Sequence, residues 1–362
     1  MHPASLITSP TSCDFHMTEK QEIKVVAIGG GTGLSTMLGG LKRYLPTGQR
    51  SNETAPQQYP SLAARLIEMQ IRLTAIVTVT DDGRSSGRLR REFSVLPPGD
   101  IRSCLVALAR EDRLMTRLFQ HRFPGHGEVG GHSLGNLIIL ALSQMQGDFL
   151  SALDQTRMLL GCTARILPST LETVDLVAEI GEQIAPGQRA IKALRLADQR
   201  RISRIAIQPA SVSPVPEAIE AILEADLITL GPGSLFTSVI PNLLINGIAD
   251  AINASRAKRI YICNAMTESD ETDGFTAADH VDELLRHGRG VKIDYALFNS
   301  AIISGAMQRK YAAEHAIAID PPPRGRADNQ VYYVSVPLVS EDRAVRHDPE
   351  KLTQAIFELY HL

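Results

Sequence analysis

The sequence predicts an α/β fold of the doubly wound type, with a mainly parallel sheet and a small β-rich insertion. An apolar run at residues 23–28 indicates a buried parallel strand, and a glycine-rich turn at residues 29–33 follows it. A second strand that ends in a similar turn occupies residues 226–238. Strand-like and helix-like segments alternate around these two units, which is typical of a parallel sheet covered by helices.

The first turn has four glycines within five residues, and the apolar residues after it have the spacing of one helix face. A strand, a glycine turn and a helix in this order point free backbone N–H groups at an anion. Glycine favours this geometry because it accepts a positive φ and has no Cβ to keep a phosphate away. We predict that Gly30, Gly31, Thr32 and Gly33 bind a phosphate. The alternative is a tight turn without a ligand.

This turn matches neither of two common nucleotide-binding motifs. Leu34 and Thr36 stand where the fingerprint G-x-G-x-x-G would need its third glycine, and no Gly-Lys-Ser/Thr follows as in a P-loop. An NAD-linked oxidoreductase is therefore an alternative that the broken fingerprint disfavours.

The other elements follow in order. Residues 46–60 are predicted as a polar surface loop, and residues 62–69 as a short helix. Asp100 is predicted to cap a helix at 101–109, and the helix at 134–145 is expected to be buried because it is apolar almost all round. Further strands are predicted at 73–80, 226–230, 259–264, 295–299 and 331–336, and further helices at 149–160, 217–225 and 279–287.

Short β-like pieces at 174–180 and 202–207, interrupted by glycine and proline, predict the insertion. The residues before the first strand lack the features of a signal peptide and are expected to form a flexible tail, with Met17 an alternative translation start to Met1. The predicted divisions are 1–22 (tail), 23–165 (first part of the α/β domain), 166–212 (insertion), 213–340 (second part) and 341–362 (C-terminal segment).

Composition excludes several classes of function. The net charge is −3, aromatic residues make up 5% and Trp is absent, which disfavours a nucleic-acid partner. The four cysteines are far apart, so neither a metal site nor a disulfide framework is expected, and a reducing cytoplasm fits. No apolar run reaches the ~18 residues of a membrane span, so membrane insertion is not expected. Doubly wound proteins are often dimers, so a homodimer is an expectation that the sequence leaves open.

Polar residues follow several predicted strands, where ligands of doubly wound sheets bind. Asp81 and Asp82 either hold Mg²⁺ against phosphates, bond a ribose hydroxyl, or form a turn with Gly83. The segment 84–91 offers hydroxyls, among them Ser86, and arginines for anionic oxygens; a solvated charged face is the alternative. His126 and His132 have no further ligand at metal-like spacing, and a hydrolase triad is rejected because Gly-x-Ser-x-Gly is absent.

The second turn, residues 231–238, repeats the pattern Gly-x-Gly-Ser/Thr of the first. Its paired glycines favour a phosphate or sugar contact through Gly233 and Ser234, and Asn264 follows the next strand along the chain. Backbone capping by the serine and threonine hydroxyls is the alternative. We expect the two turns to face one crevice.

Together these residues resemble the gluconeogenesis factor family (YvcK-like), within the superfamily of 2-phospho-lactate transferase (CofD-like). The resemblance covers roughly residues 23–304. Its motifs also contain Ser86 and Asn136, which we add to the predicted ligand-binding residues, although Asn136 by itself favours a bond to backbone. The motifs are Gly29-Gly-Gly-Thr-Gly-Leu34, Thr80-Asp-Asp-Gly-Arg-Ser-Ser-Gly87, Pro98-Gly-Asp-Ile-Arg102, Gly131-His-Ser-Leu-Gly-Asn136, Gly231-Pro-Gly-Ser-Leu-Phe-Thr-Ser238 and Asn264-Ala-Met-Thr267.

The resemblance implies a Rossmann-like fold, a cytoplasmic protein, and a nucleotide-sugar ligand such as UDP-N-acetylglucosamine or UDP-glucose. It also implies a role in cell shape and in growth on gluconeogenic carbon sources. We expect no required cofactor and no catalytic residue. The family often has Gln and Gly where this chain has Glu268 and Asp270, which adds two acids near the presumed ligand.

The sequence is interpreted as that of a nucleotide-sugar-binding regulatory protein. In this interpretation the first turn binds the diphosphate, and Asp81 or Asp82 binds a ribose or a cation. Ser234 and Asn264 bind the remaining polar groups of the ligand. The alternative is a Mg²⁺-dependent transferase, which the resemblance describes as moving phospho-lactate from a guanosine diphosphate donor to a deazaflavin precursor. Asp81 and Asp82 would then carry the metal. The absence of an unmistakable general base favours binding over chemistry.

Overall fold

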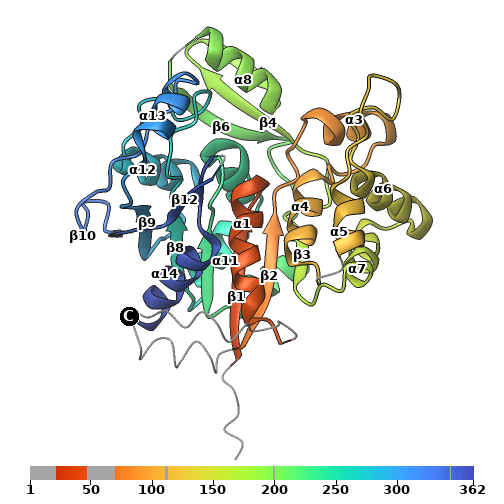
Figure 1. The fold of residues 1–362 in the computed structure, drawn as a ribbon, viewed down its shortest axis with the longest axis horizontal. Coiled ribbons are helices and arrows are strands. Elements are labelled where there is room, and N and C mark those ends of the chain that lie inside the picture. Colours follow the sequence, from red (N-terminus) through yellow and green to blue (C-terminus); the bar gives the residue numbers. More distant parts are fainter. Residues whose placement is uncertain (1–21, 47–69, 111–112, 199, 343) are drawn as a thin grey trace, which may run out of the picture.

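The central sheet reverses its strand order beside the first strand of the chain. The structure, a computed structural model, describes residues 22–46, 70–110, 113–198, 200–342 and 344–362. Within these residues, eight strands form one sheet in the order β10-β11-β9-β8-β7-β1-β2-β3, parallel except for β10 (Figure 1). The order runs outward as β1, β2, β3 on one side and as β7, β8, β9 on the other, so the switch point lies between β1 and β7. The predicted doubly wound, mainly parallel sheet is thus confirmed.

The strands of this sheet are β1 (Glu22–Gly29), β2 (Gln70–Val77), β3 (Arg165–Pro168), β7 (Leu227–Leu230), β8 (Lys258–Ile262), β9 (Tyr295–Asn299), β10 (Gly325–Arg326) and β11 (Tyr332–Val336). Two smaller antiparallel sheets are β5 (Gln183–Pro186), β4 (Asp175–Ile180) and β6 (Ile202–Gln208), and the hairpin of β12 (Val339–Glu341) and β13 (Val345–His347).

The helices of the first half are α1 (Gly31–Leu41), the 3₁₀ turn Lys42–Tyr44, α3 (Arg84–Phe93), α4 (Gly99–Leu108), α5 (Arg113–Gln120), α6 (Leu134–Gln146), α7 (Phe149–Leu159) and α8 (Gln188–Ala197). Those of the second half are α9 (Pro216–Leu223), the π-helix η2 (Leu235–Val239), α10 (Ile240–Leu243), α11 (Ile248–Ala254), α12 (Ala277–His287), α13 (Gly305–Ala312) and α14 (Pro349–His361).

Helices cover both faces of the sheet. Figure 1 shows α14, α1 and α4 side by side in front of the central strands, with α11 behind them. Strands β1 and β2 are buried over most of their length, and the α1 residues that face the sheet, Leu34, Met37 and Leu38, are 0% exposed. Burial on both faces explains why these strands have continuous apolar runs rather than alternating ones.

The β-rich insertion lies above the carboxyl ends of the central strands in Figure 1. It contains the β5-β4-β6 sheet and also α8, a helix in the stretch where the sequence suggested only β-like pieces and rising charge. Ile166, at the predicted start of the insertion, belongs to β3 and pairs with Ala75 of β2 in the main sheet. The predicted loop and helix between residues 47 and 69 lie outside the described residues.

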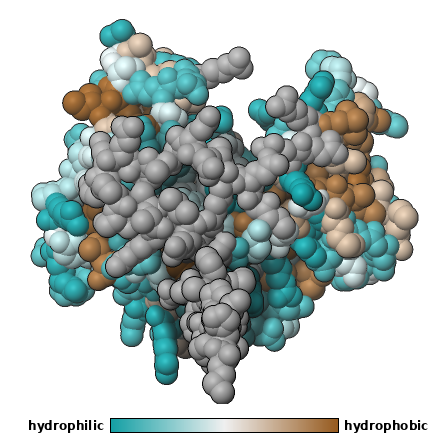
Figure 2. Space-filling model, turned by 60° about the horizontal axis from the view of Figure 1, so that its bottom comes forward, coloured by the Kyte–Doolittle hydropathy of each residue, from teal (hydrophilic) through white to brown (hydrophobic). Residues whose placement is uncertain are grey.

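Two local predictions are wrong. Asp100 does not cap α4: Pro98 is the N-cap residue, and Asp100 stands in the first turn of the helix. Helix α6 is only half buried, because Met145 is 76% exposed and the buried residues are confined to its first two turns. Figure 2 shows apolar side chains gathered on the right of the molecule, the side on which α5, α6 and α7 lie in Figure 1.

No single helix among the described residues combines the length and the apolar composition that crossing a membrane requires.

Candidate functional site

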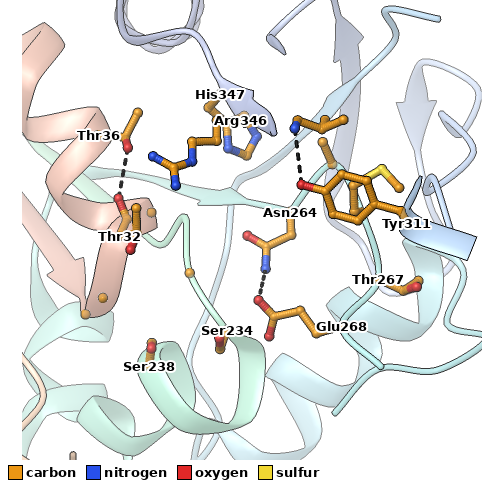
Figure 3. A pocket seen from close by; sticks show the side chains of 17 residues that line it. Thr32, Thr36, Ser234, Ser238, Asn264, Thr267, Glu268, Tyr311, Arg346 and His347 are labelled. Atoms are coloured by element: carbon orange, nitrogen blue, oxygen red, sulfur yellow. Dashed lines mark hydrogen bonds between the residues drawn. The ribbon is translucent and has the colours of Figure 1, made fainter. Parts of the chain in front are cut away.

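A cavity of ≈ 320 Å³ opens at the switch point between β1 and β7. Both glycine turns contribute to it, as do the segment after β8, helix α13 and strand β13 (Figure 3). Ligands of doubly wound sheets bind outside the carboxyl ends of the strands at this point. Its lining residues are Gly30, Gly31, Thr32, Gly33, Thr36, Gly233, Ser234, Ser238, Asn264, Ala265, Met266, Thr267, Glu268, Tyr311, Val345, Arg346 and His347.

The glycines of the first turn are required by close packing and by backbone conformation. A Cβ on Gly30 would lie 2.8 Å from Asp100 Oδ2, and one on Gly33 would lie 2.6 Å from the carbonyl oxygen of Pro232. Gly31 has φ +65°, in the left-handed region that glycine adopts readily. A Cβ there would face the cavity with only Ser238 Oγ nearby, at 3.6 Å. A ligand can therefore approach the backbone closely at Gly31.

The first turn of α1 faces this cavity. Its N-cap residue, Gly30, has no side chain, and the helix contains no acidic residue in its first turn. The early N–H groups of a helix lack intrahelical partners and carry partial positive charge, which stabilises a bound anion. Thr32 and Gly33 line the cavity, so the backbone at the helix N-terminus is available to a phosphate.

Asp100 lies directly behind this turn, where its carboxylate accepts a hydrogen bond from the N–H of Gly31. Burial, with the charge of Asp81 second, raises the pKa of Asp100 to about 7. A carboxyl group with that pKa is partly protonated at neutral pH. It therefore places less negative charge beside a phosphate than an ordinary aspartate would.

The second turn is built differently. Gly231 and Gly233 have φ +81° and +155°, and the chain then enters η2, whose five residues are all buried. The amide of Phe236 donates to Glu271 Oε2 at 3.1 Å, and the Thr237 hydroxyl donates to Oε1 at 2.6 Å. Burial, and next the charge of Glu268, raises the pKa of Glu271 to about 8. The prediction that both turns face one crevice fits the structure, and in both a buried carboxyl group accepts from an early helical amide, Asp100 from Gly31 and Glu271 from Phe236.

Asn264 and Glu268 form the lower wall of the cavity (Figure 3). Asn264 Nδ2 donates to Glu268 Oε1 at 3.3 Å. Burial raises the pKa of Glu268, while a hydrogen bond from Ser234 lowers it. The predicted residues Ser234 and Asn264 thus both bond the carboxylate of Glu268. The sequence had marked Glu268 only as a departure from the family pattern.

Three further side chains that line the cavity come from parts of the sequence without a motif. Figure 3 shows the exposed guanidinium of Arg346 extending toward Thr32 and Thr36, over the first turn. Tyr311 accepts a hydrogen bond from the amide of Val345 at 3.1 Å, which joins α13 to β13. His347 is buried, and that burial lowers its pKa to about 4, so it is neutral at pH 7. The segment 341–362 has no glycine turn or long strand pattern, so no sequence signal marked these residues.

Four of the predicted residues lie outside the described cavity lining. Asp81 Oδ1 accepts from the Gly83 amide at 2.9 Å, and Asp82 accepts from the amide of Arg189 in the first turn of α8. Ser86 Oγ accepts from the Gly99 amide at 3.1 Å. Asn136 bridges Ser85 and Arg102 in a buried network that also contains His132. Asp82, Ser86 and Asn136 thus form bonds between elements around the site, Asp81 bonds within its own loop, and Asn136 bonds two side chains rather than the backbone it was expected to bond. The cavity lining contains the other predicted residues: Gly30, Gly31, Thr32, Gly33, Gly233, Ser234 and Asn264.

The donor set for Mg²⁺ is incomplete within the protein. Asp81 and Asp82 bond backbone amides of two different segments, at Gly83 and at α8. In the part of the chain that the structure describes, no group of three or more His, Cys, Asp or Glu side chains converges as a metal site. Mg²⁺ commonly takes one or two carboxylates and completes its shell with phosphate oxygens and water. These two residues would therefore hold the ion only together with a bound phosphate.

Comparisons with known proteins agree with one another. The model of the family described as 2-phospho-L-lactate transferase CofD matches residues 25–339. The chain is 38% identical over 341 residues to the gluconeogenesis factor of Bacillus subtilis, covering 94% of this chain and 98% of that protein. It is 36% identical over 345 residues to the gluconeogenesis factor of Listeria monocytogenes, covering 95% and 97%. A crystal structure of a Bacillus halodurans protein superposes with a TM-score of 0.81 at 38% identity, covering 93% of this chain and all of that one.

Proposed function

The chain belongs to the gluconeogenesis factor family within the CofD-like superfamily, and from this premise we propose that it binds a nucleotide-sugar and acts as a regulatory protein. The observation that carries the proposal is the cavity at the switch point, where the open first turn of α1 meets the guanidinium of Arg346. A helix N-terminus with an arginine extending over it suits a diphosphate.

The remaining walls suit the two ends of such a ligand. Ala265, Met266 and Val345 provide apolar surface beside Tyr311, which fits a nucleoside. Ser234, Asn264 and Glu268 provide polar groups on the opposite wall, which fits a sugar. In this arrangement the diphosphate lies across Gly31, Thr32 and Gly33.

The relatives are named for gluconeogenesis, and we propose the same role for this chain: ligand occupancy would report the supply of nucleotide-sugars during growth on gluconeogenic carbon sources. A role in cell shape and a cytoplasmic location belong to this proposal. The CofD family match supports one alternative, a transferase that uses a guanosine diphosphate donor and Mg²⁺. Asp81 and Asp82 bond backbone amides here, so they would hold that ion only together with a bound phosphate.

Calorimetry on the full chain tests the proposal. UDP-N-acetylglucosamine or UDP-glucose should bind, and should raise the melting temperature more than NAD or GDP does. A ligand at 100 times its Kd adds ~2.7 kcal/mol of stability. Stronger stabilisation by NAD or GDP would refute a UDP-sugar site.

Arg346→Ala should weaken UDP-sugar binding by roughly 10–100-fold, since a hydrogen bond to a charged group contributes about 1.5–3 kcal/mol. The matched control is Arg324→Ala, which removes an exposed arginine that does not line the cavity. Equal affinities of the two variants would show that the diphosphate does not lie under Arg346.

A further inference from the structure

We propose that a second cavity, between α8 of the insertion and the second glycine turn, receives the glycosyl group, and that Glu268 makes it select neutral sugars over acidic ones. This inference rests on the proposed nucleotide-sugar site and adds the chemistry that distinguishes one sugar from another. The cavity measures ≈ 380 Å³. It is lined by Gln188, Ile191, Lys192, Ser234, Thr237, Glu268, Asp270 and Glu271.

The two cavities adjoin. Ser234 and Glu268 line both of them, so each forms part of the boundary between the two spaces. A phosphate held at the first turn therefore lies one side chain away from the second cavity. A group attached to that phosphate can extend past Ser234 toward α8, while the nucleoside occupies the opposite end near Tyr311.

The wall formed by α8 is anchored at several points. Gln188 Nε2 donates to Thr80 Oγ1 at 3.1 Å and to the carbonyl of Thr237 at 3.2 Å. Arg195 is 2% exposed and pairs with Asp273 at 2.5 Å. These bonds join the insertion to both halves of the sheet. The walls of the second cavity are therefore held in place, so its shape can distinguish one sugar from another.

The charged side chains that line this cavity differ in how fully they are paired. Lys192 Nζ pairs with Asp270, so the positive charge is already matched. Both carboxyl oxygens of Glu271 already accept hydrogen bonds, from the amide of Phe236 and the hydroxyl of Thr237. Glu268 receives hydrogen bonds from Asn264 and Ser234, and a carboxylate has about four lone-pair sites. It therefore keeps acceptor capacity for the hydroxyl groups of a sugar.

This arrangement favours one class of sugar and rejects another. A neutral hexose offers O–H donors to Glu268. A uronic acid of the same size would place a carboxylate next to Glu268 and Asp270, with no unpaired cation among the lining residues to compensate. Like charges in one cavity discriminate against the wrong ligand without any loss of contact to the right one. Because burial raises the pKa of Glu268, this discrimination strengthens as the pH rises.

The test is calorimetry with UDP, UDP-glucose and UDP-glucuronate. The unmutated protein should bind UDP-glucose at least tenfold more tightly than UDP-glucuronate, and Glu268→Gln should reduce that ratio to about twofold, because glutamine keeps an acceptor and loses the charge. Lys192→Glu changes a side chain that is 62% exposed, and should instead increase the ratio by adding a negative charge. The control Glu220→Gln, on the exposed face of α9, should leave the ratio unchanged.

The outcomes separate the two proposals. If UDP itself fails to bind, the nucleotide-sugar site and this inference both fail. If UDP binds and UDP-glucuronate binds as tightly as UDP-glucose, only this inference is overturned. The same conclusion follows if Glu268→Gln and Lys192→Glu both leave the ratio as it was.

Discussion

The two glycine turns have similar sequences and different structures. After β1, Gly31 enters an eleven-residue α-helix whose first turn opens on the cavity. After β7, Gly233 leads into a five-residue π-helix that is buried throughout and has its amide at Phe236 bonded to Glu271. At the first turn Asp100 bonds the amide of Gly31, while Thr32 and Gly33 line the cavity; at the second, Ser234 lines it.

The difference between them comes from a residue far along the chain. Glycine determines which backbone angles each turn can adopt, and both turns use positive φ. Whether a turn's amides remain available depends on what packs against it. Glu271 lies 35 positions beyond Phe236 and takes its N–H, so the pattern Gly-x-Gly-Ser/Thr alone does not identify an anion site.

The largest effect is expected from a substitution in the first turn. Gly31→Val places a branched side chain at φ +65°, which costs about 1–3 kcal/mol, and directs its methyl groups into the cavity. Binding of a UDP-sugar should weaken by roughly 100-fold or more, equivalent to ~2.7 kcal/mol. Calorimetry measures this loss while circular dichroism shows that the chain remains folded.

Gly39→Val is the matched control, because Gly39 lies in the same helix with nothing within 4 Å of a Cβ and outside the lining of the cavity. It should bind with the parental affinity. If Gly31→Val also binds normally, the first turn is only a structural corner, and the second turn would have to hold the phosphate.

Much of this fold could be predicted because its central strands have distinctive local sequences. Strands β1, β2, β7 and β8 each contain a short apolar run with β-branched residues, which burial on both faces favours, and β9 and β11 are short runs rich in apolar and aromatic residues. The glycines after β1 and β7 are marked equally well, since their φ angles and close contacts exclude other residues. These turns locate the switch point.

The rest of the site depends on contacts that no local pattern encodes. Arg346 and His347 reach the cavity because the hairpin of β12 and β13 folds back over it, and Tyr311 because α13 does. Asp100 has the sequence context of a helix cap, yet it bonds the amide of Gly31. Such roles come from tertiary packing, which also made α8 a helix within a predicted β region.

A smaller effect, on stability rather than binding, should follow from changing the residue that closes the second turn. The pKa of Glu271 is raised to about 8 from an ordinary 4.5, so the folded chain retains a proton that the unfolded chain releases. The contribution of Glu271 to the stability is therefore greatest below pH 4.5 and is lost as the pH rises toward 8. A loss of a few kcal/mol, at about 2 °C per kcal/mol for a chain of this length, corresponds to several degrees in Tm.

Glu271→Gln should reduce the fall in Tm between pH 5 and pH 9, because glutamine resembles the protonated acid and does not titrate. Thermal unfolding across this range measures the change. Glu220→Gln, an exposed substitution on α9, should follow the parental curve. A Glu271→Gln curve that runs parallel to the parental one would mean that Glu271 is ionised in the folded chain throughout.

The smallest effect is expected where the sequence suggested a metal. Asp81→Asn and Asp82→Asn each keep a carbonyl oxygen that can accept the amide hydrogen bond now made to Gly83 or to Arg189, so the turn and the start of α8 should survive. UDP-sugar affinity should change by less than about threefold, a difference below ~0.7 kcal/mol, and should be the same with and without EDTA.

Asp82→Ala is the sharper comparison: it removes the acceptor and should lower stability by about 0.5–2 kcal/mol without changing the response to EDTA. Affinity of the unmutated chain that collapses on adding EDTA, and that either asparagine variant abolishes, would instead assign these carboxylates to Mg²⁺ and favour the transferase. The first turn would then bind a metal-bridged diphosphate, and its difference from the second turn would include a cation as well as a set of open amides.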